Sequence, residues 1–227
     1  MAINILVTHS GGFHADELLS SVVLTRLFPE ASLMRSRDEL CITPATDKII
    51  YDVGGNYDIE AQISDHHQSP GPLRDNGQPF SSFGLNWNHY RCAYLESLNV
   101  PSQNIDPIHA QLDDDFVLPI DLVDNGVIEP SVAGPMSHLT LPVLLDNLRP
   151  VFDDGSTHAD DEAFFQPYQS QAASLKLQST NGWQKPAHDT SCSWQLQKQG
   201  NRLYWNFQWA CHTVLRLKTP KPITYFL

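Results

Sequence analysis

Residues 3–17 read INILVTHSGGFHADE, and this stretch decides the fold. Its first six residues are mostly β-branched or apolar and predict a short buried strand over residues 3–8. The polar and glycine residues His9–Gly12 follow and predict a turn. From His14 to Phe28 the apolar residues recur at helical spacing, and Pro29 ends the pattern. The stretch therefore predicts a strand that leads through a tight turn into a helix with one apolar stripe.

The rest of the first half continues the alternation of strands and helices. Residues 31–36 and 48–53 are further strand candidates, and the second ends at a glycine pair. Residues 69–81 are rich in Pro, Gly and Asn and predict a loop, while helices are predicted over 82–98 and 105–123. This order predicts an α/β fold with a doubly wound, mostly parallel sheet, in which ligands bind at the carboxyl ends of the strands.

Composition excludes several classes of protein. No run of about 18 apolar residues occurs, which argues against a membrane span. The first residues lack the features of a secretory signal or a transit peptide. The four cysteines contain no CxxC pair, which argues against a disulfide framework or a thiolate zinc site. We therefore expect a cytoplasmic protein with no membrane partner.

The net charge of −12 is unevenly distributed. Residues 1–130 hold 19 acidic and 6 basic residues, a net charge of −13, whereas residues 131–227 hold 7 and 8, a net charge of +1. A nucleic-acid-binding protein that depends on counterion release needs a basic face. An anionic substrate would therefore need bound cations to approach the acidic part.

Four segments supply imidazole and carboxylate groups just after a predicted strand or at a turn. Such a mixture of nitrogen and oxygen ligands is typical of Mn, Fe, Co or Zn sites that activate water. Carboxylates gathered in one crevice repel each other unless a divalent cation lies between them. With two ions about 3.5–4 Å apart, one carboxylate can bridge both. The segments are HSGGFHADE (His9–Glu17), DVGGNYD (Asp52–Asp58), DHHQ (Asp65–Gln68) and DLVDNG (Asp121–Gly126).

Each segment alone has a structural interpretation. A strand-end aspartate such as Asp52 is commonly a turn former, and His-His pairs occur by chance on surfaces. Asp124-Asn-Gly is most simply a turn, and the acidic run at residues 113–115 is typical of a solvated helix face. The metal-site hypothesis depends on the joint occurrence and the order of the four segments.

Six segments in this order give the chain a resemblance to the melanocyte proliferating gene (MYG) exonuclease family, which is related to the DHH phosphoesterases. They are THSGGFHADE, RSRD, DVGGNYD, SDHHQ, PFSSFGL and IDLVDNGV. The resemblance is dense from residue 5 to 130 and thinner to residue 178. It implies a DHH-like metal-binding domain at residues 1–130, a helical connection at 131–180 and a partial second α/β lobe at 181–227.

The resemblance also implies an activity, that of a divalent-metal-dependent hydrolase of the phosphodiesterase class. The expected enzyme is a 3′–5′ exonuclease that acts on RNA or oligonucleotide ends through water activated by two metal ions. Manganese is the expected metal, with Fe, Co, Zn or Mg as alternatives. Two further functions stay open: hydrolysis of a small phosphate compound, and an inactive metal-binding remnant.

The site residues follow from the resemblance position by position. DHH enzymes bind two Mn ions through an HxxxDxD signature, and here the corresponding stretch is one residue longer. Asp52 matches the bridging aspartate, and either Asp121 or Asp124 fills the fourth motif. The implied metal ligands are His9, His14, Asp16, Asp52, His66 and Asp121 or Asp124, and the implied catalytic residues are Asp65, His67 and Arg37. His67 or an arginine would contact the scissile phosphate, although the arginines could instead hold the crevice together.

The C-terminal region departs from the family pattern. Relatives of this kind continue beyond 227 residues through a second lobe, and residues 212–227 resemble only the opening of that lobe. We therefore expect a truncated second lobe, and whether the chain is an active enzyme depends on that truncation. The apolar side chains of Trp205, Phe207 and Trp209 would then be exposed and would favour a homo-oligomer.

Overall fold

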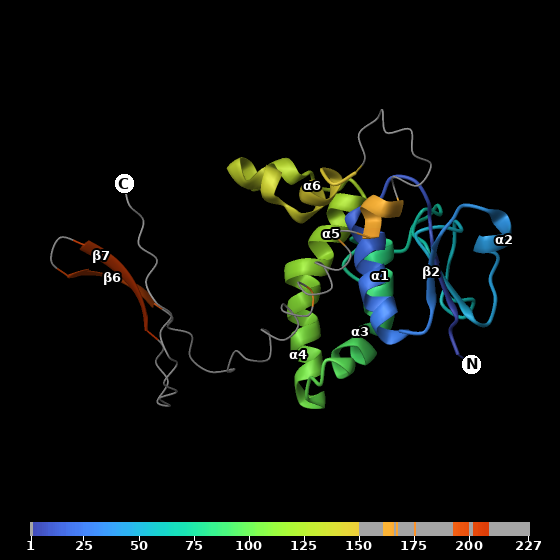
Figure 1. Cartoon of the computed structure of the whole chain (residues 1–227), viewed down its shortest axis with the longest axis horizontal. Coiled ribbons are helices and arrows are strands. Elements are labelled where there is room, and N and C mark those ends of the chain that lie inside the picture. The colour runs from blue at the N-terminus through green and yellow to red at the C-terminus, as the bar shows by residue number, and fades with distance from the viewer. Residues whose placement is uncertain are drawn as a thin grey trace. The chain divides into compact units, whose positions relative to one another are not determined.

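The computed structural model describes residues 2–149, 161–165, 167 and 175, together with the backbone of residues 193–199 and 202–208. The chain divides into two compact units, Met1–Lys185 and Pro186–Leu227. In the second unit, β6 (Ser193–Gln199) pairs with β7 (Arg202–Gln208) as an antiparallel hairpin (Figure 1). The C-terminal sequence pattern also predicts a helix over 160–177 and a strand over 213–217. Most of that helix and all of that strand lie outside the described residues, as do the side chains expected to favour self-association.

The first unit is an α/β domain. Its five-stranded sheet has the order β2-β1-β3-β5-β4. The β1–β2, β1–β3 and β3–β5 pairs are parallel, and only the β4–β5 pair of this sheet is antiparallel. The predicted α/β fold with a mostly parallel sheet is thereby confirmed. The elements are β1 (Ile5–Thr8), α1 (Ala15–Leu27), β2 (Ser32–Arg35), α2 (Glu39–Ile42), β3 (Lys48–Tyr51), β4 (Tyr57–Asp58), β5 (Ile63–Ser64), α3 (Ser82–Ser97), α4 (Ser102–Leu112), η1 (Asp113–Val117), α5 (Leu118–Asp124), η2 (Pro130–Leu139) and α6 (Leu141–Asp146).

The central strands β1 and β3 are buried on both faces, as their continuous apolar sequences predict. Successive side chains of a strand point to opposite faces. Leu6 and Ile49 accordingly pack with Leu24 of α1, whereas Val7 and Ile50 form a cluster on the other face, against which Ile42 of α2 packs. Helices α1 and α2 therefore cover opposite faces of the sheet (Figure 1).

Helix α1 is more deeply buried than its sequence predicts. We expected one apolar stripe, but every residue from Ala15 to Leu24 is buried, because the sheet covers one side of the helix and α3 and α5 pack on others. Its two serines satisfy their hydroxyls inside the protein: Ser21 Oγ lies 2.6 Å from the hydroxyl oxygen of Tyr51, and Asn86 Nδ2 donates to Ser20 Oγ at 3.1 Å. No helix among the described residues is both long and apolar enough to cross a membrane.

The helix predicted at 105–123 is instead a succession of three helical segments, α4, the π-helical η1 and α5. Within the acidic run, Asp114 and Asp115 are exposed as predicted, but Asp113 forms an ion pair with Arg74 of the loop before α3. The π-helical turn changes the helical phase just before Asp121 and Asp124. Sequence periodicity alone therefore could not assign the direction of these two carboxylates.

Asp121 of α5 anchors the N-terminal turn of α3. Its Oδ1 accepts hydrogen bonds from Ser81 N (3.1 Å), Ser81 Oγ (2.7 Å) and Gly84 N (3.1 Å). Its Oδ2 accepts from Arg74 Nη2 at 2.6 Å. A helix N-terminus has unpaired N–H groups and a positive dipole end, which together favour a carboxylate. Burial raises the pKa of Asp121 to about 6, although the bonds from Ser81 and Arg74 oppose that rise.

Gly84 is required for this close approach. A Cβ atom at this position would overlap both oxygens of the Asp121 carboxylate. Alanine favours a helix over glycine by about 1 kcal/mol, but the overlap outweighs this gain. We predict that Gly84→Ala lowers the free energy of unfolding by about 1–3 kcal/mol, the usual cost of overpacking, in urea titrations.

Cys92→Ala, at an exposed position of the same helix, is the matched control and is expected to change stability by less than about 0.5 kcal/mol. A Gly84→Ala protein as stable as the wild type would show that Asp121 does not constrain the turn.

Candidate metal centre

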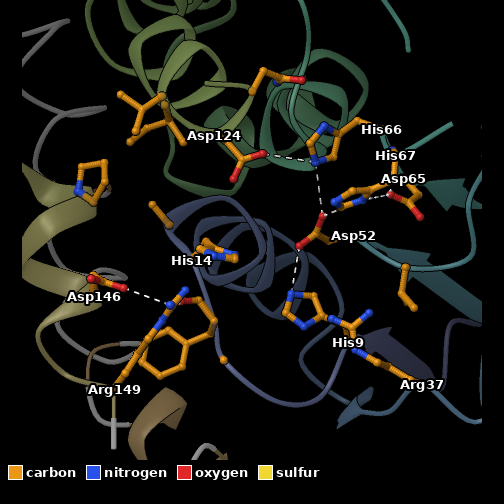
Figure 2. A pocket seen from close by; sticks show the side chains of 18 of the residues that line it. His9, His14, Arg37, Asp52, Asp65, His66, His67, Asp124, Asp146 and Arg149 are labelled. Carbon is orange, nitrogen blue, oxygen red and sulfur yellow. Dashed lines mark hydrogen bonds and ion pairs between the residues drawn. The ribbon is translucent and has the colours of Figure 1, made fainter. Parts of the chain in front are cut away.

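A cavity of about 750 Å³ lies beside the carboxyl ends of β1, β3 and β5. Its wall includes the turn after β1, the first turn of α1 and the end of α5 (Figure 2). The carboxyl edge of a parallel sheet is where ligands bind in α/β folds, so the position agrees with expectation. Predicted site residues among its lining are His9, His14, Arg37, Asp52, Asp65, His66, His67 and Asp124.

Asp52 occupies the centre of the polar cluster. The chain leaves β3 at Tyr51, and Asp52 then adopts a left-handed backbone conformation with φ of 54°. Asp52 Oδ2 lies 3.1 Å from His9 Nε2, and Oδ1 lies 3.5 Å from His66 Nε2 (Figure 2). The two oxygens of one carboxylate therefore face two different imidazoles.

Asp52 and the two imidazoles that face it shift each other's pKa values. Burial opposes ionisation of Asp52, but the hydrogen bonds from His66 and His9 outweigh it, so the pKa of Asp52 lies below its ordinary value. Burial likewise opposes protonation of His9, yet Asp52 and Glu17 raise the pKa of His9 to about 9. The pKa of His66 is also raised, by Asp52 and Asp124 against the effect of burial. Both imidazoles therefore favour the cationic form beside these carboxylates.

Asp16 is the least compensated carboxylate of the cluster. Its side chain is buried, and neither oxygen has a hydrogen-bond partner among the described residues. The nearest recorded cationic atom, His66 Nε2, is 3.9 Å from Oδ2. Burial, followed by the charges of Asp52 and Asp124, raises the pKa of Asp16 well above its ordinary value. A buried carboxylate with free oxygens among other carboxylates fits a bound cation.

The donor atoms of the cluster lie close enough together to hold metal ions. In each of four groups of three residues, one ligand atom per residue lies within 4.8 Å of the others. The groups share members, so they form one continuous cluster of imidazole nitrogens and carboxylate oxygens. They are His9, His14 and Glu17; Asp52, His66 and His67; His14, Asp16 and Asp124; and Asp16, Glu17 and Asp52. The residues present therefore fit one or more divalent cations, and this donor mixture suits several transition metals.

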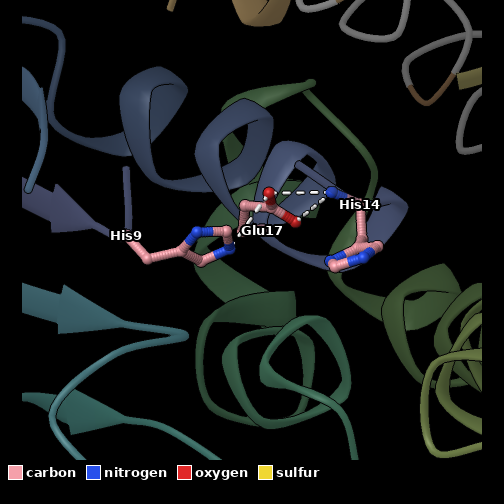
Figure 3. A group of neighbouring side chains, drawn as sticks. All are labelled: His9, His14 and Glu17. Atoms are coloured by element: carbon pink, nitrogen blue, oxygen red, sulfur yellow. Dashed lines mark hydrogen bonds and ion pairs between the residues drawn. The ribbon is translucent and has the colours of Figure 1, made fainter. Parts of the chain in front are cut away.

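Glu17 belongs to this cluster, although the sequence pattern gave it no role. Its Oε1 lies 3.2 Å from His9 Nε2, and both of its oxygens accept the backbone N–H of His14 at 2.8 Å (Figure 3). Glu17 thus ties together the two histidines of the HSGGFH turn. The available signal was its place three residues after His14, the spacing at which an acidic side chain reaches back to the start of a helix.

Asp65 holds His67 rather than joining the metal-ligand groups. It accepts hydrogen bonds from Gly55 N (2.6 Å) and His67 N (3.1 Å), and its Oδ1 lies 2.6 Å from His67 Nδ1. The Asp65 side chain is buried, whereas His67 is exposed and packs beside the ring of His66. This arrangement leaves the other ring nitrogen of His67, Nε2, for contact with a ligand.

The structure separates the two aspartates that the sequence could not distinguish. Asp124 lines the cavity, and its Oδ2 lies 3.2 Å from His66 Nε2. Asp121 instead binds Ser81 and Arg74, as described above, and takes no part in the four ligand groups. The geometry therefore places Asp124 in the cluster and Asp121 at the start of α3.

Three arginines hold the turn between His9 and His14 by donating to its backbone carbonyls. Arg35 is buried and also pairs with Asp161, whereas Arg37 and Arg149 line the cavity. Sequence reasoning did not single out Arg149, which lies 136 residues from its partner along the chain. Arg37 Nε donates to Ser10 O (3.1 Å), Arg35 Nη2 to Gly11 O (2.6 Å) and Arg149 Nε to Phe13 O (2.7 Å).

A family model and similar known proteins point to the same family. Residues 5–189 match the MYG1_exonuc family, described as an uncharacterised protein family (UPF0160). The chain is 33% identical over 181 residues to an MYG1 protein of Schizosaccharomyces pombe, covering 72% of this chain and 53% of the relative. It is 31% identical over 193 residues to the MYG1 exonuclease of Mus musculus, covering 78% and 50%. The chain thus spans about half the length of these relatives, and no solved structure matches it significantly.

The uncompensated charge of Asp16 gives a first test of the metal site. In protein treated with EDTA, we predict that Asp16→Asn raises the melting temperature, because it removes a buried carboxylate that has no hydrogen-bond donor among the described residues. The same substitution is expected to reduce or abolish the further stabilisation that Mn²⁺ or Zn²⁺ gives the wild type. Thermal unfolding with and without the metal measures both effects.

Asp121→Asn is the matched control, because Asp121 is equally buried but fully hydrogen-bonded. It is expected to lower the stability of the EDTA-treated protein by about 1–3 kcal/mol, since Ser81 and Arg74 lose a charged acceptor while Arg74 keeps its ion pair with Asp113. If both substitutions destabilise alike, Asp16 has a structural partner and the metal-site hypothesis loses its main support.

Proton release gives a second test. A metal ion that binds His9 Nε2 must displace the proton that this nitrogen holds at neutral pH, because the pKa of His9 is about 9. Metal affinity is therefore expected to rise between pH 6 and 9, by about tenfold per pH unit for each proton displaced. Calorimetric titration in buffers of different ionisation enthalpy counts the protons.

His9→Gln is expected to weaken both the affinity and its pH dependence, while His89→Gln on α3 serves as the control and leaves both unchanged. Affinity that is independent of pH in the wild type would show that the metal does not bind His9.

Proposed function

This chain belongs to the MYG1 exonuclease family (UPF0160), and we propose on that basis that it is a divalent-metal-dependent phosphoesterase. The proposed substrate is the end of an RNA or oligonucleotide, cleaved in the 3′–5′ direction. The observation that carries the proposal is Asp16, a buried carboxylate whose oxygens have no hydrogen-bond partner among the described residues and lie within a cluster of histidines and acids beside a cavity. The mouse relative that supports the nuclease assignment is itself named an exonuclease.

We propose that two divalent ions bind this cluster and that Asp52, whose two oxygens face different imidazoles, would help to hold them. Bound ions would polarise a phosphoryl oxygen and lower the pKa of water. Manganese is our first choice, and Fe, Co and Zn also suit mixed imidazole and carboxylate donors. The residues that would hold the ions are His9, His14, Asp16, Asp52, His66 and Asp124, with Glu17 as a further donor.

Other residues of the cavity would bind and orient the phosphate. Asp65 accepts a hydrogen bond from His67 Nδ1, and in the cationic form of the ring His67 Nε2 would donate a second one to a phosphoryl oxygen. Arg37 uses its Nε to hold the Ser10 carbonyl, and the remaining guanidinium nitrogens would contact a substrate phosphate. These roles would place cationic donors on a substrate that the carboxylates alone would repel.

The test is hydrolysis of a short end-labelled RNA by the purified protein with Mn²⁺. We expect Asp52→Asn to lower kcat/KM by on the order of 10²-fold or more, because even the loss of a residue that only supports a ligand costs 10–100-fold. Asparagine tolerates the left-handed backbone of Asp52, so the fold is retained.

Asp75→Asn, on the exposed loop before α3, is the control and is expected to keep full activity. The absence of Mn²⁺-dependent cleavage by the wild type, or equal cleavage by Asp52→Asn, would contradict the proposal.

A small phosphate compound is the second candidate substrate. The net charge of −13 in residues 1–130 favours it, because an extended nucleic acid needs a basic track along its backbone. Comparing the turnover of a short RNA, a dinucleotide and pyrophosphate separates the two. Metal binding without turnover of any of them would support the third alternative, a metal-binding protein that lacks activity.

A further inference from the structure

The PFSSFGL segment, residues 79–85, has so far been given no part in the chemistry. It forms the start of α3, and most of its side chains have clear structural roles. The Phe80 ring packs under the Arg74 guanidinium, Phe83 is in the core, and Ser81 and Gly84 bind Asp121. Ser82 lies within this fixed turn and contacts a different carboxylate.

Ser82 donates a hydrogen bond to the central carboxylate of the metal cluster. Its Oγ lies 3.1 Å from Asp52 Oδ1, and both side chains are buried. The ion-pair partners recorded for this carboxylate are imidazoles, from His9 at Oδ2 and from His66 and His67 at Oδ1. Ser82 is thus the uncharged donor to Asp52 among the described residues, and its hydrogen bond does not depend on an imidazole keeping its proton.

The hydrogen bond constrains a torsion that is otherwise soft. The terminal torsion of an aspartate is broad, so its carboxylate rotates easily. Here the backbone of Asp52 is fixed in a left-handed turn, and Ser82 fixes the far end by binding Oδ1. As a result, Oδ2 faces His9 while Oδ1 faces His66, so each oxygen is directed to a different part of the donor cluster.

The anchor of Ser82 is itself rigid. The turn that carries Ser82 is held by three hydrogen bonds to Asp121, and Asp121 is paired with Arg74. Neighbouring serines of one helical turn therefore serve two carboxylates with different roles: Ser81 binds the structural Asp121, and Ser82 binds Asp52. The N-terminal end of the α3 dipole further favours negative charge at both.

We propose that Ser82 is a positioning residue for Asp52 and that its hydroxyl sets the affinity of the cluster for a pair of divalent ions. The proposal rests on the metal site of the proposed function, but it does not depend on the substrate. Hydrogen bonds to metal-ligating carboxylates typically contribute 10–100-fold in metal affinity. Removal of the Ser82 hydroxyl leaves Asp52 in place and frees its carboxylate to rotate.

The experiment is calorimetric titration of the EDTA-treated, dialysed full chain with Mn²⁺ alone. Ser82→Ala is expected to weaken binding of at least one Mn²⁺ by about 10–100-fold, while its melting temperature before metal is added falls no further than that of Ser81→Ala. Ser82→Thr keeps a hydroxyl and is expected to bind Mn²⁺ more tightly than Ser82→Ala. Electron paramagnetic resonance of the loaded protein gives a second readout, because two ions that share a carboxylate are magnetically coupled.

Ser81→Ala is the matched control on the same turn. It removes a hydroxyl from Asp121 and is expected to lower the melting temperature while Mn²⁺ affinity stays as in the wild type. The contrast between adjacent serines separates positioning of the metal ligand from general support of the helix.

Three results would overturn the assignment. They are unchanged Mn²⁺ affinity in Ser82→Ala, an equal loss of affinity in Ser81→Ala, and a Ser82→Thr protein that binds no more tightly than Ser82→Ala. Wild-type protein that binds no Mn²⁺ would overturn the metal site and this inference together. Wild-type protein that binds Mn²⁺ but cleaves no phosphodiester would refute the proposed substrate and leave the role of Ser82 standing.

Discussion

The repulsion between buried carboxylates is the constraint on which the rest of this structure depends. Asp16, Glu17, Asp52 and Asp124 meet at the carboxyl edge of the sheet, where burial strengthens every charge interaction. Against the effect of burial, Asp52 and Glu17 raise the pKa of His9 to about 9, whereas both oxygens of Asp16 lack a hydrogen-bond partner within the described residues. Repulsion between these carboxylates lowers the stability of the folded protein, and such a loss of stability is common at functional sites.

The surrounding elements keep these charges in place. Arginines hold the turn that carries the two histidines after β1, and α3 presents its N-terminal turn to Asp52 and Asp121. The left-handed backbone at Asp52 costs about 1–3 kcal/mol in general and lasts only where neighbours enforce it. Here the parallel pairing of β3 and β5 on one side and the Ser82 hydroxyl on the other provide that enforcement. The surrounding elements therefore fix the positions of the site's side chains at this edge of the sheet.

Local patterns predicted much of this arrangement. The strand, turn and helix of residues 3–28 and the strand before Asp52 follow from apolar spacing and glycines, and their order fixes which chain segments meet at the sheet edge. Strands β4 and β5 escaped prediction because two residues carry no periodicity. The roles of Asp121 and Glu17 escaped it as well. The role of Asp121 depends on a π-helical turn and on Arg74, which is distant in the sequence. The role of Glu17 depends on its burial against His9. Both are tertiary contacts, and no periodic pattern in the sequence signals them.

The charged imidazoles beside Asp52 also bear on how a metal would enter the protein. Many small metal-binding domains cannot fold before their metal arrives, because nothing else neutralises their ligands. Here the raised pKa of His9 favours a proton on its ring, and that positive charge offsets the negative charges of Asp52 and Glu17. The ligands can therefore come together before a metal binds. Binding of a metal would then be an exchange of protons for metal in a protein that is already folded. Maturation of the site would be separated in time from folding, and the metal content could follow cellular supply without loss of the protein.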